Sequence, residues 1–388
     1  MISGFEIQNF TAFEKLNVSF SPRINVIIGS NGTGKTHLLK AIYALAAVDQ
    51  IPERPKQDIE GALSDKFLRL FLPTEGRIGA LRSDGSSGHA HLCAKSSDES
   101  SVAVSFNYNS KKLRFENDSR PDGKAPQPVF IPTKEVLSLV RGMGDPKHDR
   151  ATVEMIFDDT YIDLAEQLVR PGFDDEVSTI SEDPRLSSVV RELVALVGGR
   201  YRWEGERGFC FEAGSYQDRP DPERSKSKTA QAYQDSTVTH FVAKGGNPLS
   251  SSMTAEGFRK VGVLHRLLCN GAINPGSTGV LLWDEPEANL NPKLMKKLVQ
   301  VLLELSRNGQ QIILATHDYV LLKWFDLLKD DGKEDHIRFH SLYRDLKASE
   351  IRISSTDEYL AITPNPIDDA FGYLIDQEIE NDMGGLGK

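Results

Sequence analysis

Gly29-Ser30-Asn31-Gly32-Thr33-Gly34-Lys35-Thr36 is the segment from which the fold class of this 388-residue chain can be inferred. It matches G-x-x-x-x-G-K-[ST] at every fixed position. A short apolar run at residues 23–28 precedes it, and apolar residues at helical spacing follow it to about residue 47. A strand, a glycine-rich turn and a helix in this order predict a loop that wraps phosphate groups.

Each residue type in this loop has a physical task. Glycines let backbone N–H groups curl around phosphate oxygens without clashes from Cβ atoms. The positive end of the following helix points at the same anion. Lys35 adds a positive charge for the β- and γ-phosphates, and the Thr36 hydroxyl is suited to ligate Mg²⁺. The expected ligands are therefore ATP and Mg²⁺.

A second motif, Val280-Leu281-Leu282-Trp283-Asp284-Glu285-Pro286, is an apolar strand that ends in two carboxylates. In P-loop enzymes a buried strand carries one Asp to the metal, and Asp284 fits this role. Glu285 is then placed to polarise the attacking water as general base. A strand that simply ends in a charged turn has the same pattern, but the phosphate loop in the same chain favours the catalytic interpretation.

His317 ends a further apolar run, Ile312-Ile313-Leu314-Ala315-Thr316-His317-Asp318. A His at a strand end is usually a surface or capping residue. Because this one follows the Asp-Glu strand, we interpret it as a hydrogen-bond donor to the γ-phosphate.

Composition and charge limit the class of protein. Hydrophobic residues make up 39% and charged residues 26% of the chain, as in ordinary soluble globular proteins. The net charge of 46 − 56 = −10 argues against a generally basic nucleic-acid coat but leaves a local basic patch open. The three scattered cysteines suggest free thiols in a reducing compartment. No signal peptide or membrane-length apolar run is expected, so we predict a cytoplasmic protein.

The order of these motifs resembles that of an ABC (ATP-binding-cassette) ATPase. Asp284-Glu285-Pro286, Ala315-Thr316-His317-Asp318 and the opening Ile7-Gln8-Asn9-Phe10 are similar to the RecF, SMC and OLD branch, not to transporters. The segments at 255–260, 283–292 and 130–132 look like those of compact stand-alone ATPases of prokaryotic anti-phage defence loci, of the AbiEii, OLD and PARIS type.

The resemblance implies an α/β fold. It is the P-loop NTPase fold of ABC type, with a mixed central sheet, flanking helices, an antiparallel β subdomain, a short helical lobe and no long coiled coil. Four ranges are expected. Residues 1–132 form an N-terminal ATPase lobe, and residues 133–245 form a helical lobe with a mobile loop near 215–237. Residues 246–345 form a C-terminal ATPase lobe with the signature, Walker B and His loop, and residues 346–388 form a tail.

The resemblance also implies a homodimer, or a higher oligomer, built on an ATP sandwich. Each ATP would lie between one phosphate loop and the partner's signature segment, Ala255-Glu256-Gly257. Thr254 stands in place of the serine in the usual Leu-Ser-Gly-Gly-Gln, and the loop at 288–291 faces the dimer. Gln50 is a candidate for the glutamine loop, and Thr11 lies where relatives carry a basic residue near the nucleotide.

Two functions fit these observations. One is the sensor or regulatory ATPase of an anti-phage defence system that controls a separate toxic effector such as a nuclease. It is supported by the compact helical lobe and by the short stretch of about 70 residues after His317, which is too small for a second domain of usual size. The alternative is a RecF-like DNA repair ATPase that binds DNA directly and therefore has a basic surface. A transporter motor domain is the weakest interpretation.

The C-terminal residues have a helical pattern of their own. Ile367, Phe371, Leu374 and Ile375 fall on one side of a predicted helix, beside a dense set of acidic residues. The apolar side either packs on the ATPase core, which is the usual behaviour of such stripes, or docks on a basic partner.

Overall fold

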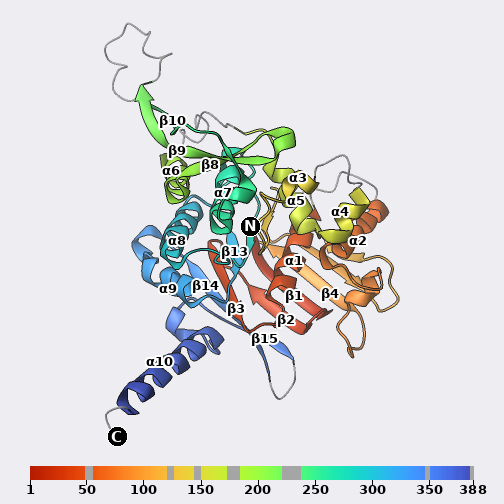
Figure 1. The fold of residues 1–388 in the computed structure, drawn as a ribbon. Helices are drawn as coiled ribbons and strands as arrows, with labels where there is room; N and C mark the ends of the chain where they lie inside the picture. The colour runs from red at the N-terminus through yellow and green to blue at the C-terminus, as the bar shows by residue number, and fades with distance from the viewer. Residues whose placement is uncertain are drawn as a thin grey trace. The chain divides into compact units, whose positions relative to one another are not determined.

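The computed structural model describes residues 1–48, 56–119, 126–143, 150–172, 184–220, 237–345 and 350–384. The chain forms two compact units (Figure 1). Unit 1 comprises Met1–Ile131, Gly279–Glu287 and Gln311–Lys388, and unit 2 comprises Pro132–Thr278 and Ala288–Gln310. Both units are discontinuous in sequence, whereas the four expected ranges are continuous, because strands from the late part of the chain complete a sheet begun near its start.

Unit 1 contains a six-stranded sheet in the order β15-β14-β3-β13-β12-β7. Its strands are β3 (Ile24–Gly29), β7 (Val129–Ile131), β12 (Leu281–Asp284), β13 (Ile312–Ala315), β14 (Ile337–Arg344) and β15 (Ile351–Thr356). All neighbours are parallel except the β14–β15 pair. Every residue of β3, β12 and β13 is buried, as expected for a parallel sheet covered on both faces.

A second, five-stranded antiparallel sheet in unit 1 has the order β2-β1-β4-β5-β6. Its strands are β1 (Ile2–Phe10), β2 (Phe13–Ser19), β4 (Ala90–Ser96), β5 (Ser101–Phe106) and β6 (Arg114–Asp118). Phe5, Phe10 and Phe13 from this sheet are fully buried in the main core of the unit. The expected antiparallel β subdomain is thus confirmed.

The α-helices that the structure describes in unit 1 are α1 (Lys35–Ala46), α2 (Lys56–Phe71), α9 (Tyr319–Leu328) and α10 (Pro366–Gly384). The predicted apolar side of α1 is buried. Helix α2 and strands β14 and β15 were not predicted. Strand β15 lies inside the range expected to be a tail, because it pairs with β14, which in turn pairs with β3 at the centre of the sheet.

Unit 2 combines helices with a small sheet. Its helices are α3 (Val140–Met143), α4 (Arg150–Ile156), α5 (Asp159–Leu168), α6 (Pro184–Val197), α7 (Glu256–Cys269) and α8 (Pro292–Arg307). Its strands are β8 (Gly199–Trp203), β9 (Phe209–Pro220), β10 (Thr237–Ala243) and β11 (Leu249–Ser250), with β9 pairing to the other three.

The expected mobile loop near 215–237 is wrong at both of its ends. Residues 215–220 belong to β9 and residue 237 begins β10, and residues 214–220 pair with residues 237–243. Residues 221–236 lie outside the described residues. Polar residues with few apolar anchors in this stretch favour a loop, but a strand is held by main-chain hydrogen bonds, which polar residues also supply.

The helices that the structure describes are short. None has an apolar stretch long enough to cross a bilayer. The longest of them, α10, has 19 residues, so the expected absence of a long coiled coil holds for the described chain.

Gln311 joins the two sheets of unit 1 through a buried amide. Its Oε1 accepts a hydrogen bond from the Ile2 N–H at 2.9 Å, and its Nε2 donates to the carbonyls of Ile2 at 2.7 Å and Ser21 at 2.9 Å. The side chain is 3% exposed. All three backbone groups therefore depend on this one residue at a place where water cannot replace it.

We expect Gln311→Leu to lower the free energy of unfolding by on the order of 3 kcal/mol, because three buried backbone groups lose a partner. Urea denaturation measures the change. Gln300→Leu on α8 is a matched control, because the buried Gln300 Oε1 has no hydrogen-bond partner among the described residues. It should change stability by less than about 0.5 kcal/mol. Equal effects of the two substitutions would contradict the assignment.

Candidate active site

The glycine-rich loop lies between β3 and α1, where packing and backbone conformation both require glycine. A Cβ on Gly34 would lie 2.6 Å from the Phe13 Cζ, and one on Gly29 would lie 2.4 Å from the Leu342 carbonyl oxygen. Gly32 has open space around it but a φ of +79°, a left-handed conformation that favours glycine. Ser30 and Asn31 are exposed at the tip of the loop. Contacts with Phe13 of β2 and Leu342 of β14 therefore restrict the backbone path of the loop.

Lys35 is folded back onto this loop. Its Nζ donates to the carbonyls of Gly29 at 2.7 Å and Ser30 at 3.2 Å, and the residue is 8% exposed. Burial lowers the pKa of the Lys35 ammonium, and the nearby carboxylates of Glu285, Asp284 and Glu287 act in the opposite direction. The positive charge of Lys35 is thus close enough to interact with the carboxylates of Asp284 and Glu285, the second predicted motif. Thr33, next to Gly34, donates through its Oγ1 to the Ser30 carbonyl at 2.8 Å and closes the turn.

Thr36 and Asp284 meet directly. The Thr36 Oγ1, in the first turn of α1, donates to the Asp284 Oδ2 at the end of β12 at 2.8 Å, and Asp284 is 4% exposed. A hydroxyl and a carboxylate are hard oxygen ligands of the kind that Mg²⁺ takes from protein while keeping water and phosphate for its other positions. Among the described residues no cluster of three or more His, Cys, Asp or Glu side chains could hold a metal. The pair therefore fits Mg²⁺ bound together with a nucleotide.

Glu285 and His317 also lie together, because they follow parallel neighbouring strands whose carboxyl ends share one edge of the sheet. The His317 Nδ1 is 3.1 Å from the Glu285 Oε1. Glu285 has a φ of +50°, which is uncommon for a residue with a side chain. Its N–H donates to the Ala315 carbonyl at 2.9 Å, so the unusual conformation is held by the neighbouring strand. Backbone strain of this kind concentrates at functional sites.

Glu287 was not identified from the sequence as a site residue. Its Oε1 accepts hydrogen bonds from the Thr316 hydroxyl at 2.7 Å and the His317 N–H at 3.2 Å, and it lies 3.7 Å from the His317 Nδ1. Burial raises the pKa of Glu287. Its other oxygen, Oε2, is buried without a partner in the described part of the chain. The sequence does show a third carboxylate, Glu287, three positions after Asp284. That its side chain points into the site depends on the turn at Glu285.

The predicted signature segment lies in unit 2, at the start of α7. A Cβ on Gly257 would lie 2.6 Å from the Asn289 carbonyl oxygen, and the Asn289 Nδ2 donates to the Glu256 Oε1 at 2.8 Å. Asn289 has a φ of +62°. The two segments expected to face a partner are thus packed against each other within one unit. The Thr254 hydroxyl is 2.7 Å from the Tyr201 hydroxyl and donates to the Ser251 carbonyl at 2.7 Å.

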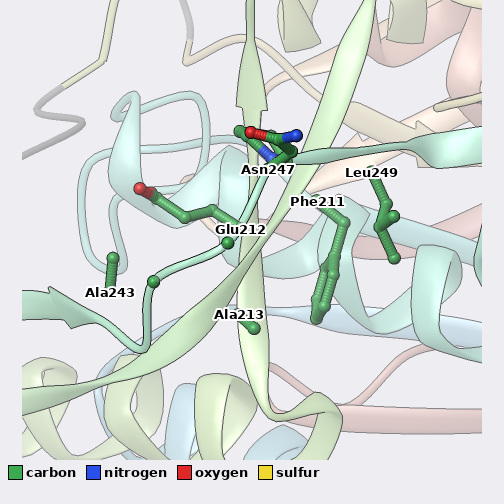
Figure 2. Close-up of a pocket in the computed structure, with 9 residues that line it drawn as sticks. Phe211, Glu212, Ala213, Ala243, Asn247 and Leu249 are labelled. Carbon is green, nitrogen blue, oxygen red and sulfur yellow. The ribbon is translucent and has the colours of Figure 1, made fainter.

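The remaining sequence-based candidates add little to the site. Gln50 lies outside the described residues. Thr11 has a φ of +47°, and its buried hydroxyl has no hydrogen-bond partner among the residues described. A hollow of about 190 Å³ in unit 2 lies elsewhere, between β9 and residues 243–249 (Figure 2). None of the predicted site residues lines it.

Comparison with known proteins places this arrangement in context. The RecF DNA replication and repair proteins of Lactobacillus johnsonii and Bacillus cytotoxicus are 49% and 51% identical to this chain over 45 residues. That stretch is 12% of this chain, and it covers only 12% of the length of each RecF protein. The crystal structure of an SMC head bound to the C-terminal winged-helix domain of ScpA has a TM-score of 0.50, with 16% identity. The match covers 92% of this chain and 97% of that one.

The SMC head shares the fold and supports the predicted ABC-type α/β architecture. A broader match comes from a family described as "AAA domain, putative AbiEii toxin, Type IV TA system", which spans residues 24–323. This range includes the glycine-rich loop, the strand that ends in Asp284 and the segment with His317. The chain is a member of this AbiEii-like AAA family of P-loop ATPases of ABC type.

Proposed function

We propose that the protein binds ATP with Mg²⁺ and hydrolyses it. The 2.8 Å contact between Thr36 and Asp284 is the observation that carries this proposal, because it unites the two halves of a nucleotide site that lie far apart in the sequence. The backbone of the loop at 29–36 and the Lys35 ammonium would bind the phosphates. Thr36 and Asp284 would hold Mg²⁺, whose chemistry there is to neutralise phosphate charge.

Glu285 is the proposed general base, because it lies beside the metal-binding pair and is 28% exposed in its side chain, so water can reach it. His317 is the proposed γ-phosphate contact, and half of its side chain is exposed. Glu287 is a proposed positioning residue. It holds the Thr316 hydroxyl and the His317 backbone, and so fixes the direction of the His317 ring without touching the substrate.

Sharing of sites between two copies is a further part of the proposal. The loop at 288–291 and the signature segment form one packed cluster, and Ala255 at the N-cap of α7 is exposed and makes no side-chain capping bond. The first N–H groups of α7 would then face the γ-phosphate of a partner's ATP. The SMC-like fold supports this head-to-tail arrangement by analogy only.

For the biological role we propose a sensor or regulatory ATPase of anti-phage defence that controls a separate toxic effector. The family description, which names an AbiEii toxin and a type IV toxin–antitoxin system, supports it. A RecF-like DNA repair role is the second candidate, supported by the 45-residue similarity. A DNA-binding titration at two salt concentrations separates them, because direct phosphate contacts give affinity that falls steeply with salt.

Glu285→Gln should keep ATP binding and lower kcat by about 10²- to 10⁴-fold, because it removes the base and leaves Asp284 in place. Lys35→Ala should instead weaken ATP binding itself. Binding of a fluorescent ATP analogue and phosphate release measure the two effects separately. Hydrolysis by Glu285→Gln at the wild-type rate would falsify the general-base assignment.

Glu287→Ala should lower kcat by about 10- to 100-fold with little change in ATP affinity, because the Thr316 hydroxyl and the His317 N–H lose their acceptor. Glu287→Gln keeps an acceptor oxygen and should retain most of the activity. Steady-state kinetics and direct ATP binding give the two quantities. If the Gln and Ala variants lose activity equally, the carboxylate charge matters and the positioning role is wrong.

Shared sites can be tested by mixing two inactive variants, Lys35→Ala and Ala255→Asp. Asp is a favoured N-cap residue, so it should preserve α7 while its charge repels phosphate. A mixed pair keeps one intact composite site, so random pairing should restore about a quarter of wild-type activity. Gly257→Asp is a poorer choice, because its Cβ would meet the Asn289 carbonyl.

Ala255→Ser, which caps the helix without charge, is the control and should hydrolyse ATP nearly normally. Absence of any recovery at all mixing ratios would argue that each subunit hydrolyses ATP alone.

A further inference from the structure

Helix α10 presents an apolar face that is covered only at its beginning. Ile367 is 6% exposed, and the Phe371 ring stacks on Tyr319 with centroids 4.2 Å apart. Beyond this point Leu374, Ile375 and Ile379 are 53%, 50% and 50% exposed. The expectation that the whole stripe packs on the core is therefore wrong after Phe371. Figure 1 shows α10 starting beside α9 and running on to the C-terminus.

The first turn of α10 is fixed to unit 1. The Asn365 Oδ1 accepts a hydrogen bond from the Asp368 N–H at 3.2 Å, which caps the helix, and the Tyr359 hydroxyl donates to the Asp368 Oδ1 at 2.5 Å. Among the described residues, the later turns make no hydrogen bond to the rest of unit 1, and every residue from 369 to 382 except Gln377 is exposed. The helix is thus anchored at one end and presents its other turns to solvent.

The charges on α10 are all of one sign. Residues 366–384 contain six acidic residues and no Lys, Arg or His, the acids being Asp368, Asp369, Asp376, Glu378, Glu380 and Asp382. The last three lie near the negative end of the helix dipole, which is unfavourable. Two like-charged pairs, Asp376 with Glu380 and Glu378 with Asp382, have the i, i+4 spacing that destabilises a helix. A cationic surface would relieve each of these repulsions.

This charge pattern decides among possible occupants of the apolar face. Membrane headgroups and nucleic acids are neutral or anionic and offer nothing to six carboxylates. A second copy of the chain is also a poor match, because the residues outside α10 sum to 46 − 50 = −4. We propose that α10 is the docking helix for a separate protein that offers an apolar groove edged by Lys or Arg side chains. This goes beyond ATP hydrolysis and does not depend on it.

Binding of a synthetic amphipathic helical peptide of leucine and lysine to the full-length protein tests the proposal by fluorescence anisotropy. The wild type should bind it, and should not bind peptides of the same pattern made of leucine and glutamate or of glutamine and lysine. The double change Leu374→Ser with Ile375→Ser should weaken binding at least about tenfold, because it removes two apolar contacts. Glu378→Gln with Asp382→Asn, two acids on the same side of the helix as Leu374 and Ile375, should weaken it most at low salt.

Tyr373→Ser is the matched control, since Tyr373 is 69% exposed but lies on the opposite side of the helix. It should bind the peptide like the wild type. Truncation after Gly372 keeps Ile367 and Phe371 in place and should abolish binding while leaving ATP hydrolysis unchanged. Two outcomes overturn the proposal. One is binding that is absent, or equal for wild type, the double variant and the truncation. The other is a wild-type dimer in sedimentation that Leu374→Ser with Ile375→Ser dissociates, which identifies a second copy as the occupant.

Discussion

The hydrogen bond between the Thr36 hydroxyl and the Asp284 carboxylate spans 248 positions of the sequence, and the site is arranged around it. It forms because β3, β13 and β12 are parallel neighbours, so that the turns following them meet at one edge of the sheet. The registers pair Asp284 with Ala315 and Ala315 with Ile27. The alignment of these strands therefore brings together the phosphate loop, the carboxylates of Asp284 and Glu285, and His317.

Charge is the second constraint on this edge. Lys35 and the carboxylates of Asp284, Glu285 and Glu287 lie close together in a region of low exposure, where electrostatic interactions are stronger than in water. Burial lowers the pKa of Lys35, and the three carboxylates oppose this effect. Burial raises the pKa of Glu287, and its hydrogen bonds from Thr316 and His317 oppose that effect. The group holds one cation against three acidic side chains, so a bound Mg²⁺ would supply the positive charge that both these carboxylates and a triphosphate chain with four negative charges require.

The sequence predicted those parts of the molecule that are determined by residues close together in the chain. The loop at 29–36, α1 and the strands that end in Asp284 and Ala315 follow from apolar runs and a spacing that few folds share. Strand β14 was missed because its letters, IRFHSLYR, mix polar and apolar residues although it pairs with β3. Glu287 was missed because its direction depends on the left-handed turn at Glu285, which the letters do not encode. The α10 stripe was seen, but periodicity alone cannot say whether a face is covered.

The contact between Gly257 and the Asn289 carbonyl has a consequence for how such proteins diverge. The backbone carbonyl of Asn289 leaves no room for a Cβ at position 257. Any other residue at this position would therefore require the loop at 288–291 to move. The closing oxygen belongs to the backbone, so side-chain changes at 288–291 that keep the path of this loop leave the requirement for glycine at position 257 unchanged.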